Sequence, residues 1–537
     1  MKNITKFMSS KWSAWSALFI VLVLTAIVRY RLVSVPLERD EGEYAYAGQL
    51  ILQGVPPYQD IYNMKLPGIY AAYALLLAIF GQTHQGIHAG LLIINTITTI
   101  FVFLLAKEAV NRLGAVVSAA SFALLSISQS VQGVFANAEH FVIVFAVAGL
   151  LVLLRALASE KLWKLFVSGL LLGLSSMMKQ HGLAFSALGA LYIVFDSSRQ
   201  RPVLWSRLML RLFTFAAGVI AVFGCVCLIM AWAGVFKSFW FWTVDYAGVY
   251  VTRVPLDLAW QAFIRPATSI VSSAPLLWTL IGFGLVALVT KSITKDYGVF
   301  VVMYAVFSVL SICPGFYFRE HYFVLLLPCA SLLAGIAASS LGDFLPGVSS
   351  KRVEYGVPIL LLVVCLCQSI YQQRNFLFHM TPLEISRSTY GLNPFHESLE
   401  IADFIRKRTD AEDHIAILGS EPQIYFYSQR RSATGYIYMY PMTENNDLAL
   451  QMQKEFIKDI EAKNPKYVLF VNVPTSWLYR RDSHMEVLEW FNDYQKRVLR
   501  LVGVVELLDD RTLYRWAPNV RGPVASRFWV AIFERAA

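Results

Sequence analysis

Long runs of hydrophobic residues alternate with short polar joints over the first two thirds of the chain. A helix needs about 20 mostly apolar residues to cross the hydrocarbon core of a bilayer. The pattern therefore predicts a polytopic α-helical membrane protein of about eleven spans. The predicted spans are 12–33, 86–106, 114–131, 140–157, 165–179, 182–196, 212–233, 267–290, 297–313, 322–340 and 355–371.

One further apolar segment, "LPGIYAAYALLLAIFG" at 66–81, is predicted not to cross the membrane. It is short, and counting it as a span would break the alternation of basic joints with other joints. We therefore interpret it as an interfacial or re-entrant element.

Basic joints are typical of the cytoplasmic side. They carry Lys107 and Arg112, Arg155, Lys161 and Lys164, Arg199, Arg201, Arg207 and Arg211, Lys291 and Lys295, and Lys351 and Arg352, with Lys2, Lys6 and Lys11 at the N-terminus.

Beyond Tyr371 the pattern becomes that of a soluble α/β domain, which the alternation of joints places outside the cytoplasm. Helical periodicity in "HESLEIADFIRKR" and "LALQMQKEFIKDIEAKNP" predicts two helices. Strands are predicted in "HIAILG" and "KYVLFVN", and a hairpin turning at Asp509-Asp510 in "LVGVVELLDDRTLYRW". The predicted domains are 1–371, with its outer loop 34–85, and 372–537.

Composition agrees with this class. Hydrophobic residues make up 57% of the 537 residues and charged residues 15%, against about a quarter charged in soluble proteins. The net charge of +10 comes mostly from one set of joints, so it does not indicate a nucleic-acid partner. The six cysteines lie in or beside apolar segments without metal-site spacing, and no disulfide is expected. The first apolar segment lacks a cleavage site and is expected to be retained.

Ionisable residues gather at the predicted outer ends of the spans. Such residues are often ordinary helix ends, but these converge from four separate loops on one face, which indicates a site. They are Asp40, Glu41 and Lys65 in the first outer loop, Glu139 and His140 in the second, Lys179 and His181 with Gln180 in the third, and Arg319, Glu320 and His321 in the last one before the tail.

Each candidate also has a structural explanation, and the sequence leaves both readings open. Asp40 fits the N-cap of a helix whose capping box would close with Glu43. Lys179 sits between two apolar helices and could simply pair with Glu139. The others could be polar helix ends: Lys65, Arg319 and His321.

The chemistry available to such a cluster is group transfer from a phosphate. A carboxylate can act as general base on an acceptor hydroxyl, and lysine, arginine or a divalent metal ion can stabilise a departing phosphate. A sugar linked to a lipid phosphate supplies that leaving group at membrane depth. The sequence carries no nucleotide-binding fingerprint, in keeping with a donor other than a nucleotide sugar.

Several motifs in order resemble the GT-C glycosyltransferases, in particular the protein O-mannosyltransferases and the lipid A aminoarabinose transferases. They are "RDE" with "GEYAYAGQLILQG" after the first span, a lysine before Pro67, "NAEHF", "GLSSMMKQHG" and "REHYFVLLLPCASLL". The resemblance covers about residues 10–340. It implies a polyprenyl-phosphate sugar donor, an acceptor that meets it in an outer cavity, and inversion at the anomeric carbon.

Carried over by position, the resemblance implies Asp40 as the catalytic carboxylate with Glu41 beside it. It also implies Lys65 and Lys179 near the donor phosphate and Glu139 as an acidic position of the second outer loop. One departure is Met64, where the lipid A transferases carry an acidic residue, so a metal or aminosugar role for that position is in doubt.

The sequence therefore favours a glycosyltransferase of the inner (plasma) membrane that acts on an envelope glycan, lipid or protein acceptor. We expect Asp40 and Glu41 to be catalytic. Two further groups complete the expected site: Lys65, Lys179, Arg319 and His321 for the donor phosphate, and Glu139 and His140 near the acceptor.

Two other classes compete with the enzyme, a transporter or flippase of a lipid-linked saccharide and a scaffold. A transporter would carry its charges at mid-span, whereas these lie at span ends. The tail segment "LGSEPQIYFYSQRRSATGYIYMYP" has tyrosines and Arg430-Arg431 that could face sugars or pack in a core.

Overall fold

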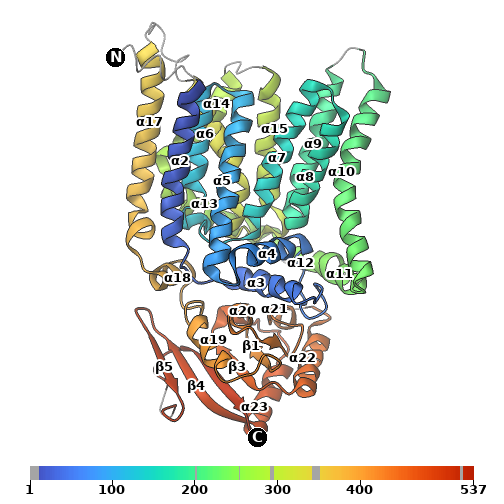
Figure 1. The fold of residues 1–537 in the computed structure, drawn as a ribbon, viewed down its shortest axis with the longest axis vertical. Helices are drawn as coiled ribbons and strands as arrows, with labels where there is room; N and C mark the ends of the chain where they lie inside the picture. Colours follow the sequence, from blue (N-terminus) through green and yellow to red (C-terminus); the bar gives the residue numbers. More distant parts are fainter. Residues whose placement is uncertain are drawn as a thin grey trace.

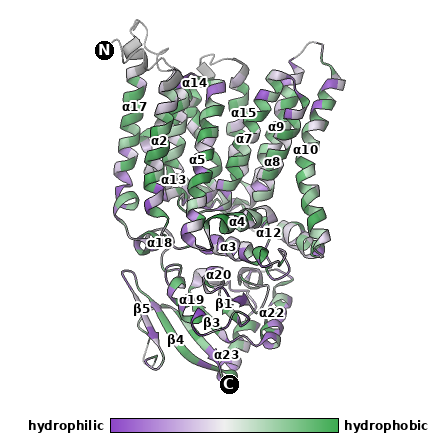
Figure 2. Ribbon diagram, viewed as in Figure 1, coloured by the Kyte–Doolittle hydropathy of each residue, from purple (hydrophilic) through white to green (hydrophobic). Residues whose placement is uncertain are grey.

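The computed structural model describes residues 11–199, 202–252, 254–290, 295–340, 351–444, 446–520 and 524–536. A bundle of long helices forms one end of the molecule and a mixed α/β domain the other (Figure 1). Hydrophobic residues dominate the bundle helices, whereas the α/β domain is mixed (Figure 2). The N-terminal Lys2 and Lys6, with Arg201 and Lys291, lie outside the described residues.

A helix occupies each of the eleven segments predicted to span. Five helices of the described residues are long and apolar enough to cross a membrane, or six if a bent pair counts as one span. The number of crossings therefore stays a prediction. The bundle helices are α2 (Lys11–Leu32), α5 (His84–Ala109), α6 (Arg112–Leu125), α7 (Ala138–Ser159), α8 (Leu162–Met178), α9 (Leu183–Ser198), α10 (Trp205–Trp232), α14 (Pro275–Thr290), α15 (Lys295–Ile312), α16 (Leu327–Ser340) and α17 (Lys351–Gln372).

The predicted span 267–290 is wrong as a single helix. Its first residues belong to α13 (Leu256–Ser273), which meets α14 at a bend of 105°. Pro275 begins α14, and proline removes a backbone donor and restrains the residue before it, which favours a break there.

Two helices of the segment between α2 and α5 lie across the end of the bundle that faces the α/β domain. These are α3 (Arg39–Leu52) and α4 (Pro67–Phe80) (Figure 1). The apolar segment 66–81 therefore forms a short helix lying along this end, and its interfacial placement stays a prediction. Gly54, where the sequence ends the first of these helices, has a left-handed φ of +82° that glycine adopts without strain.

Short helical segments complete this end of the bundle and connect it to the tail. They are η1 (Gln129–Val131), η2 (Gln180–Gly182), α11 (Phe236–Trp240), η3 (Phe241–Tyr246), α12 (Ala247–Val251), η4 (Pro314–Phe316), η5 (Glu320–Leu326), η7 (Asn375–His379) and α18 (Pro382–Tyr390).

The tail forms a six-stranded mixed sheet in the order β2-β1-β3-β6-β4-β5. Strands β1 (His414–Leu418) and β3 (Tyr467–Asn472) are parallel, and β4 (Leu499–Leu507) and β5 (Thr512–Trp516) form the predicted hairpin. The predicted helices are confirmed as α19 (Ser398–Arg406) and α22 (Ala449–Lys463). The remaining elements are α20 (Pro422–Ser428), β2 (Arg431–Ser432), α21 (Tyr440–Thr443), η8 (Pro474–Ser476), α23 (Glu486–Val498) and β6 (Phe528–Arg535).

Candidate active site

The acidic residues that open α3 have different environments. Glu38 is the N-cap: its carboxylate accepts from the Glu41 backbone N–H at 2.9 Å, and the Glu41 carboxylate accepts from the Glu38 N–H at 3.2 Å. The predicted capping box of Asp40 with Glu43 is therefore wrong, because the helix begins at Arg39. Asp40 lies in the first turn with its side chain unused by the cap.

Asp40 is held between a lysine of the first outer loop and a tyrosine of the tail. Its Oδ2 accepts from Lys65 Nζ at 3.0 Å, and its Oδ1 accepts from the Tyr438 hydroxyl at 3.1 Å. Lys65 also donates to the Tyr44 hydroxyl at 3.1 Å. These contacts fix the carboxylate while leaving 21% of its side chain exposed.

Lys179 forms the ion pair with Glu139 that the sequence allowed. Its Nζ lies 2.5 Å from Glu139 Oε1 and 4.0 Å from the centre of the Tyr322 ring. The ring attracts the ammonium through its negative face. Lys179 itself is C-cap to α8 and is buried.

One cavity brings Asp40 together with three cations. It has an empty volume of about 1020 Å³, including the part open to solvent. Arg319, which makes no ion pair with a described residue, is the exposed cation of this cavity. The lining residues with polar side chains are Asp40, Asn63, Lys65, Lys179, Gln180, His181, Tyr246, Tyr250, Tyr317, Arg319, Tyr322, Tyr438, Tyr440 and Glu444.

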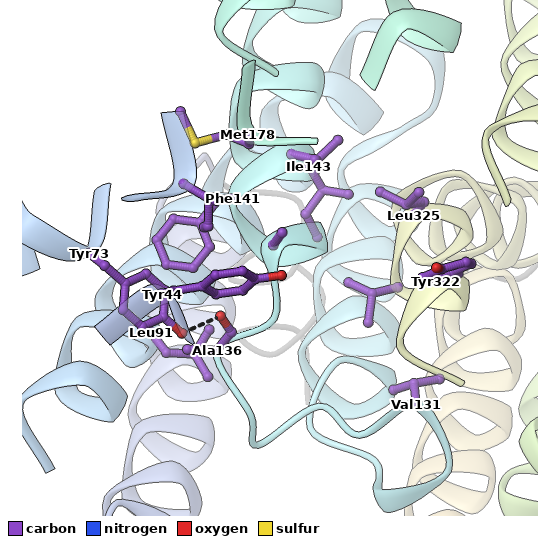
Figure 3. Close-up of a cluster of buried hydrophobic side chains, with 14 of the residues drawn as sticks. Tyr44, Tyr73, Leu91, Val131, Ala136, Phe141, Ile143, Met178, Tyr322 and Leu325 are labelled. Atoms are coloured by element: carbon purple, nitrogen blue, oxygen red, sulfur yellow. Dashed lines mark hydrogen bonds between the residues drawn. The ribbon is translucent and has the colours of Figure 1, made fainter. Parts of the chain in front are cut away.

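A cluster of buried aromatic and aliphatic side chains includes Tyr322 of the cavity and Tyr44, which bonds Lys65 (Figure 3). Tyr44 and Tyr73 pack edge to face with ring centres 5.3 Å apart, and Tyr73 packs against Phe141. The Tyr73 hydroxyl donates to the Ala136 carbonyl at 2.7 Å. Side chains locked in this way hold a site in one geometry.

Two residues predicted for the site do not line this cavity. Glu41 is fully buried, and its carboxylate accepts from Ala136 N at 2.5 Å and faces His88 Nε2 at 2.9 Å. His140 is buried, and neither of its ring nitrogens bonds to a described residue. The capping box turns Glu41 toward the bundle and helix α7 buries His140, so neither side chain reaches this cavity, and their catalytic and acceptor roles stay predictions.

Two further predicted residues lie behind the cavity wall. His321 directs its Nδ1 toward Gln132 Oε1 at 3.0 Å. Glu139 contacts the cavity only through Lys179. The structure thus assembles Asp40, Lys65, Lys179 and Arg319 at one surface.

Two carboxylates of α3, Asp40 in the cavity and Glu43 behind it, have pKa values shifted in opposite directions. Burial alone would raise the pKa of Asp40, but Lys65 and the other nearby cations lower it below the usual range. Glu43, one turn further along α3, is fully buried, and burial raises its pKa to about 7. Its Oε1 accepts from the Tyr70 hydroxyl at 2.5 Å. Asp40 is therefore ionised at neutral pH, whereas Glu43 is partly protonated.

The sequence did not indicate that the tail contributes to the cavity, and it gave no role to His181 of the third joint. Tyr438 and Tyr440 reach the cavity from the α/β domain, and His181 lines it from η2. Both tyrosines belong to the tail segment whose sequence allows contact with sugars or packing in a core. Arg430 of the same segment is buried and donates to backbone carbonyls such as Thr409 O at 2.7 Å. Contacts between segments far apart in the sequence decide which of these tail residues lines the cavity and which one is buried in the domain.

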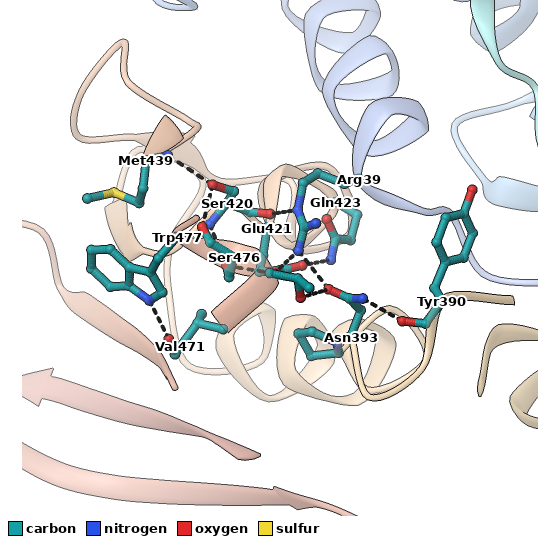
Figure 4. Close-up of polar contacts among 12 residues, drawn as sticks. Arg39, Tyr390, Asn393, Ser420, Glu421, Gln423, Met439, Val471, Ser476 and Trp477 are labelled. Atoms are coloured by element: carbon teal, nitrogen blue, oxygen red, sulfur yellow. Dashed lines mark hydrogen bonds and ion pairs between the residues drawn. The ribbon is translucent and has the colours of Figure 1, made fainter. Parts of the chain in front are cut away.

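An ion pair and its hydrogen bonds fasten α3 to the tail (Figure 4). Arg39 pairs with Glu421 at 2.7 Å, and donates to Asn393 Oδ1 at 3.0 Å and to the Ser420 carbonyl. Glu421 also accepts from Ser476 Oγ at 2.8 Å. The helix that carries Asp40 is thereby fixed to the domain that supplies Tyr438.

The donor set does not fit a divalent metal ion. Such ions take several oxygen ligands, mostly carboxylates. Within the described ranges, no group of three or more His, Cys, Asp or Glu side chains is placed to hold a metal ion. The cavity offers Asp40 and Glu444 against Lys65, Lys179 and Arg319, and Lys65 already occupies one oxygen of Asp40.

Comparison with known proteins agrees with this arrangement. Residues 64–226 match the sequence model of the dolichyl-phosphate-mannose-protein mannosyltransferase family. ArnT from Cupriavidus metallidurans, solved bound to undecaprenyl phosphate, superposes with a TM-score of 0.59 at 13% identity over 96% of this chain and 97% of ArnT. The chain has the GT-C fold. The resemblance to GT-C glycosyltransferases predicted from the sequence is confirmed.

A second GT-C structure is similar at comparable identity. The oligosaccharyltransferase AglB from Archaeoglobus fulgidus, in complex with an inhibitory peptide and a dolichol-phosphate, has a TM-score of 0.54 at 12% identity, over 97% of this chain and 76% of AglB. The same archaeal enzyme was also solved with Zn and sulfate, with a TM-score of 0.53 at 12% identity over 92% of this chain and 72% of that one. A comparison with curated protein sequences gives no match. Of the cavity cations in this GT-C chain, Lys65 and Lys179 lie within the family match, and Arg319 lies beyond it.

Proposed function

We propose that this protein is a glycosyltransferase that moves a sugar from a polyprenyl phosphate to an envelope glycan, lipid or protein, at the outer face of the inner membrane. The observation that carries the proposal is the cavity in which Asp40 meets Lys65, Lys179 and Arg319. The fold and the family match support it, because structures of this fold were solved with undecaprenyl phosphate and with dolichol-phosphate.

Asp40 is the proposed general base. Lys65 and Tyr438 each bond one oxygen of its carboxylate, and each oxygen has a further lone pair for an acceptor hydroxyl. The hydroxyl oxygen bonds to the anomeric carbon as the bond from that carbon to the phosphate oxygen breaks. The proton passes to Asp40 and the lipid phosphate leaves. Attack opposite the leaving group inverts the anomeric carbon.

Arg319, Lys179 and Lys65 are proposed to hold the donor phosphate. The phosphate gains negative charge as the glycosidic bond breaks, so cations stabilise the transition state more than the bound donor. Arg319 is best placed for this role because no described carboxylate pairs with it and it is exposed in the cavity. The two lysines are less available to the phosphate, because each is already paired with a carboxylate: Lys179 with Glu139 and Lys65 with Asp40. The account uses no step through a metal ion.

Glu41 and Glu139 are proposed as positioning residues. Glu41 ties the first turn of α3 to Ala136 and His88, and Glu139 holds Lys179. His321 is proposed to act on the phosphate only through the wall segment that it shares with Arg319. The charges lie at helix ends next to the tail, which supports an enzyme over a transporter with charges at mid-span.

The test uses the purified full-length protein with undecaprenyl phosphates that carry single sugars. We expect transfer to a glycolipid extract of the cell envelope, with release of one undecaprenyl phosphate for each sugar transferred, both followed by mass spectrometry. In parallel, envelope glycolipids from cells with and without the gene should differ by one sugar. Lipid binding without transfer, together with translocation of the intact lipid-linked sugar in vesicles, would favour the flippase instead.

A further inference from the structure

A second cavity, called here the polar groove, lies at the end of the bundle where α17 leads into α18 (Figure 1). Its walls come from η1, α13, η5, α17 and α18, and its empty volume is about 1090 Å³, including the part open to solvent. Every described side chain that lines it is polar: serines, a threonine, glutamines and one carboxylate, that of Glu320. Among these described residues there is no lysine or arginine.

The polar side chains of the groove are open to solvent. Ser269 and Ser272 of α13 and Ser388 of α18 are exposed, and Glu320 of η5 is half-buried. Their hydroxyl and carboxylate groups are therefore available to a bound molecule.

Hydrogen bonds between its own side chains fix the shape of the groove. Ser130 donates to Ser273 Oγ at 3.1 Å, which joins η1 to α13. Gln129 donates to Ser388 Oγ at 3.0 Å, which joins η1 to α18. A surface that is ordered before binding loses less conformational entropy when a ligand arrives.

The lining favours an uncharged saccharide over a phosphate or a peptide. Serine and threonine hydroxyls and glutamine amides both donate and accept hydrogen bonds, as the hydroxyls of a sugar do. A phosphate would meet no cation among the described lining residues, whereas the cavity of Asp40 offers three. A peptide recognised by apolar anchors would find no apolar side chain in the described lining.

The polar groove is a neighbour of the cavity that holds Asp40. Arg319 lines that cavity, and Glu320, the next residue, lines the groove. Burial raises the pKa of Tyr390 on α18, and Asp40 and Glu320 are among the carboxylates that raise it further. The Tyr390 hydroxyl donates to Oε1 of Gln132, a groove residue, at 3.1 Å. Tyr390 therefore lies near both the proposed base and the groove.

We propose that the polar groove binds uncharged sugar units of the acceptor, so that the acceptor is a glycan or a glycolipid. The inference rests on the proposed function, because it takes Asp40 to be the base that receives the proton of the acceptor. It assigns the sugar units of the acceptor to the groove and leaves the donor phosphate to the cations of the neighbouring cavity.

The first test measures binding to the immobilised full chain in detergent. Three fractions of the cell envelope serve as probes: neutral oligosaccharides released from its glycans and glycolipids, anionic oligosaccharides, and peptides from its proteins. Mass spectrometry measures how much of each fraction is retained. We expect the wild type to retain neutral oligosaccharides. Ser272→Phe, which fills the groove with a ring, should retain about tenfold less, and Ser388→Phe should have the same effect from α18.

Thr268→Phe is the matched control. Thr268 is an exposed hydroxyl residue of α13 that does not line the groove, so the same new side chain should leave retention as in the wild type. Equal losses in Thr268→Phe and Ser272→Phe would overturn the inference. So would a loss confined to the anionic or peptide fraction, or a wild type that retains no neutral oligosaccharide.

Steady-state transfer from a polyprenyl-phosphate sugar separates the inference from the function beneath it. Ser272→Phe should raise the KM for the acceptor about tenfold and leave the KM for the donor unchanged. If the wild type transfers sugar and the acceptor KM of Ser272→Phe is unchanged, the inference is wrong while the proposed function stands. If the wild type retains neutral oligosaccharides but transfers no sugar, the proposed function fails, and the acceptor role of the groove fails with it.

Discussion

The three acidic residues at the start of α3 have different roles: Glu38, Asp40 and Glu41. Glu38 and Glu41 close the capping box, and Asp40 faces the cavity. The sequence predicted a capped acidic cluster but placed the cap two residues late. Aspartate is a preferred N-cap residue and glutamate is not, so local preference favoured Asp40. In the structure Glu38 is the N-cap instead, because Glu41, its partner in the capping box, is held by tertiary contacts with Ala136 and His88.

The buried Glu43 should make stability depend on pH. Its pKa of about 7 in the folded protein lies above the ordinary value of 4.5, so the folded state holds the proton more tightly than the unfolded chain. The stability from this group is present below about pH 4.5 and falls as the pH rises to 7. The loss is on the order of 3 kcal/mol.

Glu43→Gln should remove that dependence. Thermal unfolding of the detergent-solubilised protein, measured between pH 5 and 8, should show the variant gaining stability relative to the wild type as the pH rises. A constant difference between the two proteins across this range would contradict the raised pKa.

The cations of the cavity should affect turnover more than donor affinity. Lys179→Ala and Arg319→Ala should each lower turnover by tens to a thousandfold, because each removes a contact that strengthens as the phosphate leaves. Steady-state kinetics with a purified polyprenyl-phosphate sugar measures both quantities. Arg374, an exposed arginine stacked on Tyr371 away from the cavity, offers the control Arg374→Ala. Unchanged turnover in both cavity variants would mean that these residues are ordinary helix ends.

At the scale of elements, periodicity and length predicted most helices and four of the six tail strands. The apolar runs became helices because every peptide group in an apolar medium must bond within its own segment. The break between α13 and α14 was missed, since hydropathy averages over the residues around Ala274 and Pro275. Strand β6 was missed too. It pairs with both β3 and β4, and such long-range pairing leaves little local signal.

The orientation of α4 predicts on which side of the membrane the end of this helix lies. If 66–81 stays at the outer surface, a cysteine at the exposed Gln82, in a protein lacking the six native cysteines, should react with an impermeant maleimide added outside. Ser159→Cys, at the end of α7, is the matched control and should react only after the membrane is opened. Gln82→Cys that reacts only from the cytoplasm would show that 66–81 spans.

At the scale of the whole molecule, the tail completes the cavity. Composition predicted a membrane part and an α/β domain, but it gave no sign that Tyr438 bonds Asp40 or that Arg39 pairs with Glu421. These contacts join residues nearly 400 positions apart, which no local pattern encodes. The convergence of Asp40, Lys65, Lys179 and Arg319 was predicted because the alternation of basic joints places their loops on one side.

The buried pair between α3 and the tail should contribute strongly to stability. Glu421→Ala leaves Arg39, whose side chain is 11% exposed, without its ion-pair partner, which costs on the order of 3 kcal/mol. Thermal unfolding should show a clear loss, accompanied by weaker activity as α3 loosens from the tail. Asp403→Ala breaks exposed contacts to Arg406 and Lys407 and should cost under about 1 kcal/mol. Equal effects of the two variants would show that the Arg39 network does not fasten the domains.

The central claim is that Asp40 is the base of a sugar transfer from polyprenyl phosphate. Asp40→Asn keeps the size of the side chain and removes its charge, and the capping box of Glu38 and Glu41 stays intact. The most direct measurement is the turnover of purified Asp40→Asn with the polyprenyl-phosphate sugar that the wild type uses, alongside its thermal unfolding. We expect a folded protein whose turnover falls at least a thousandfold. Transfer at the wild-type rate would contradict the account.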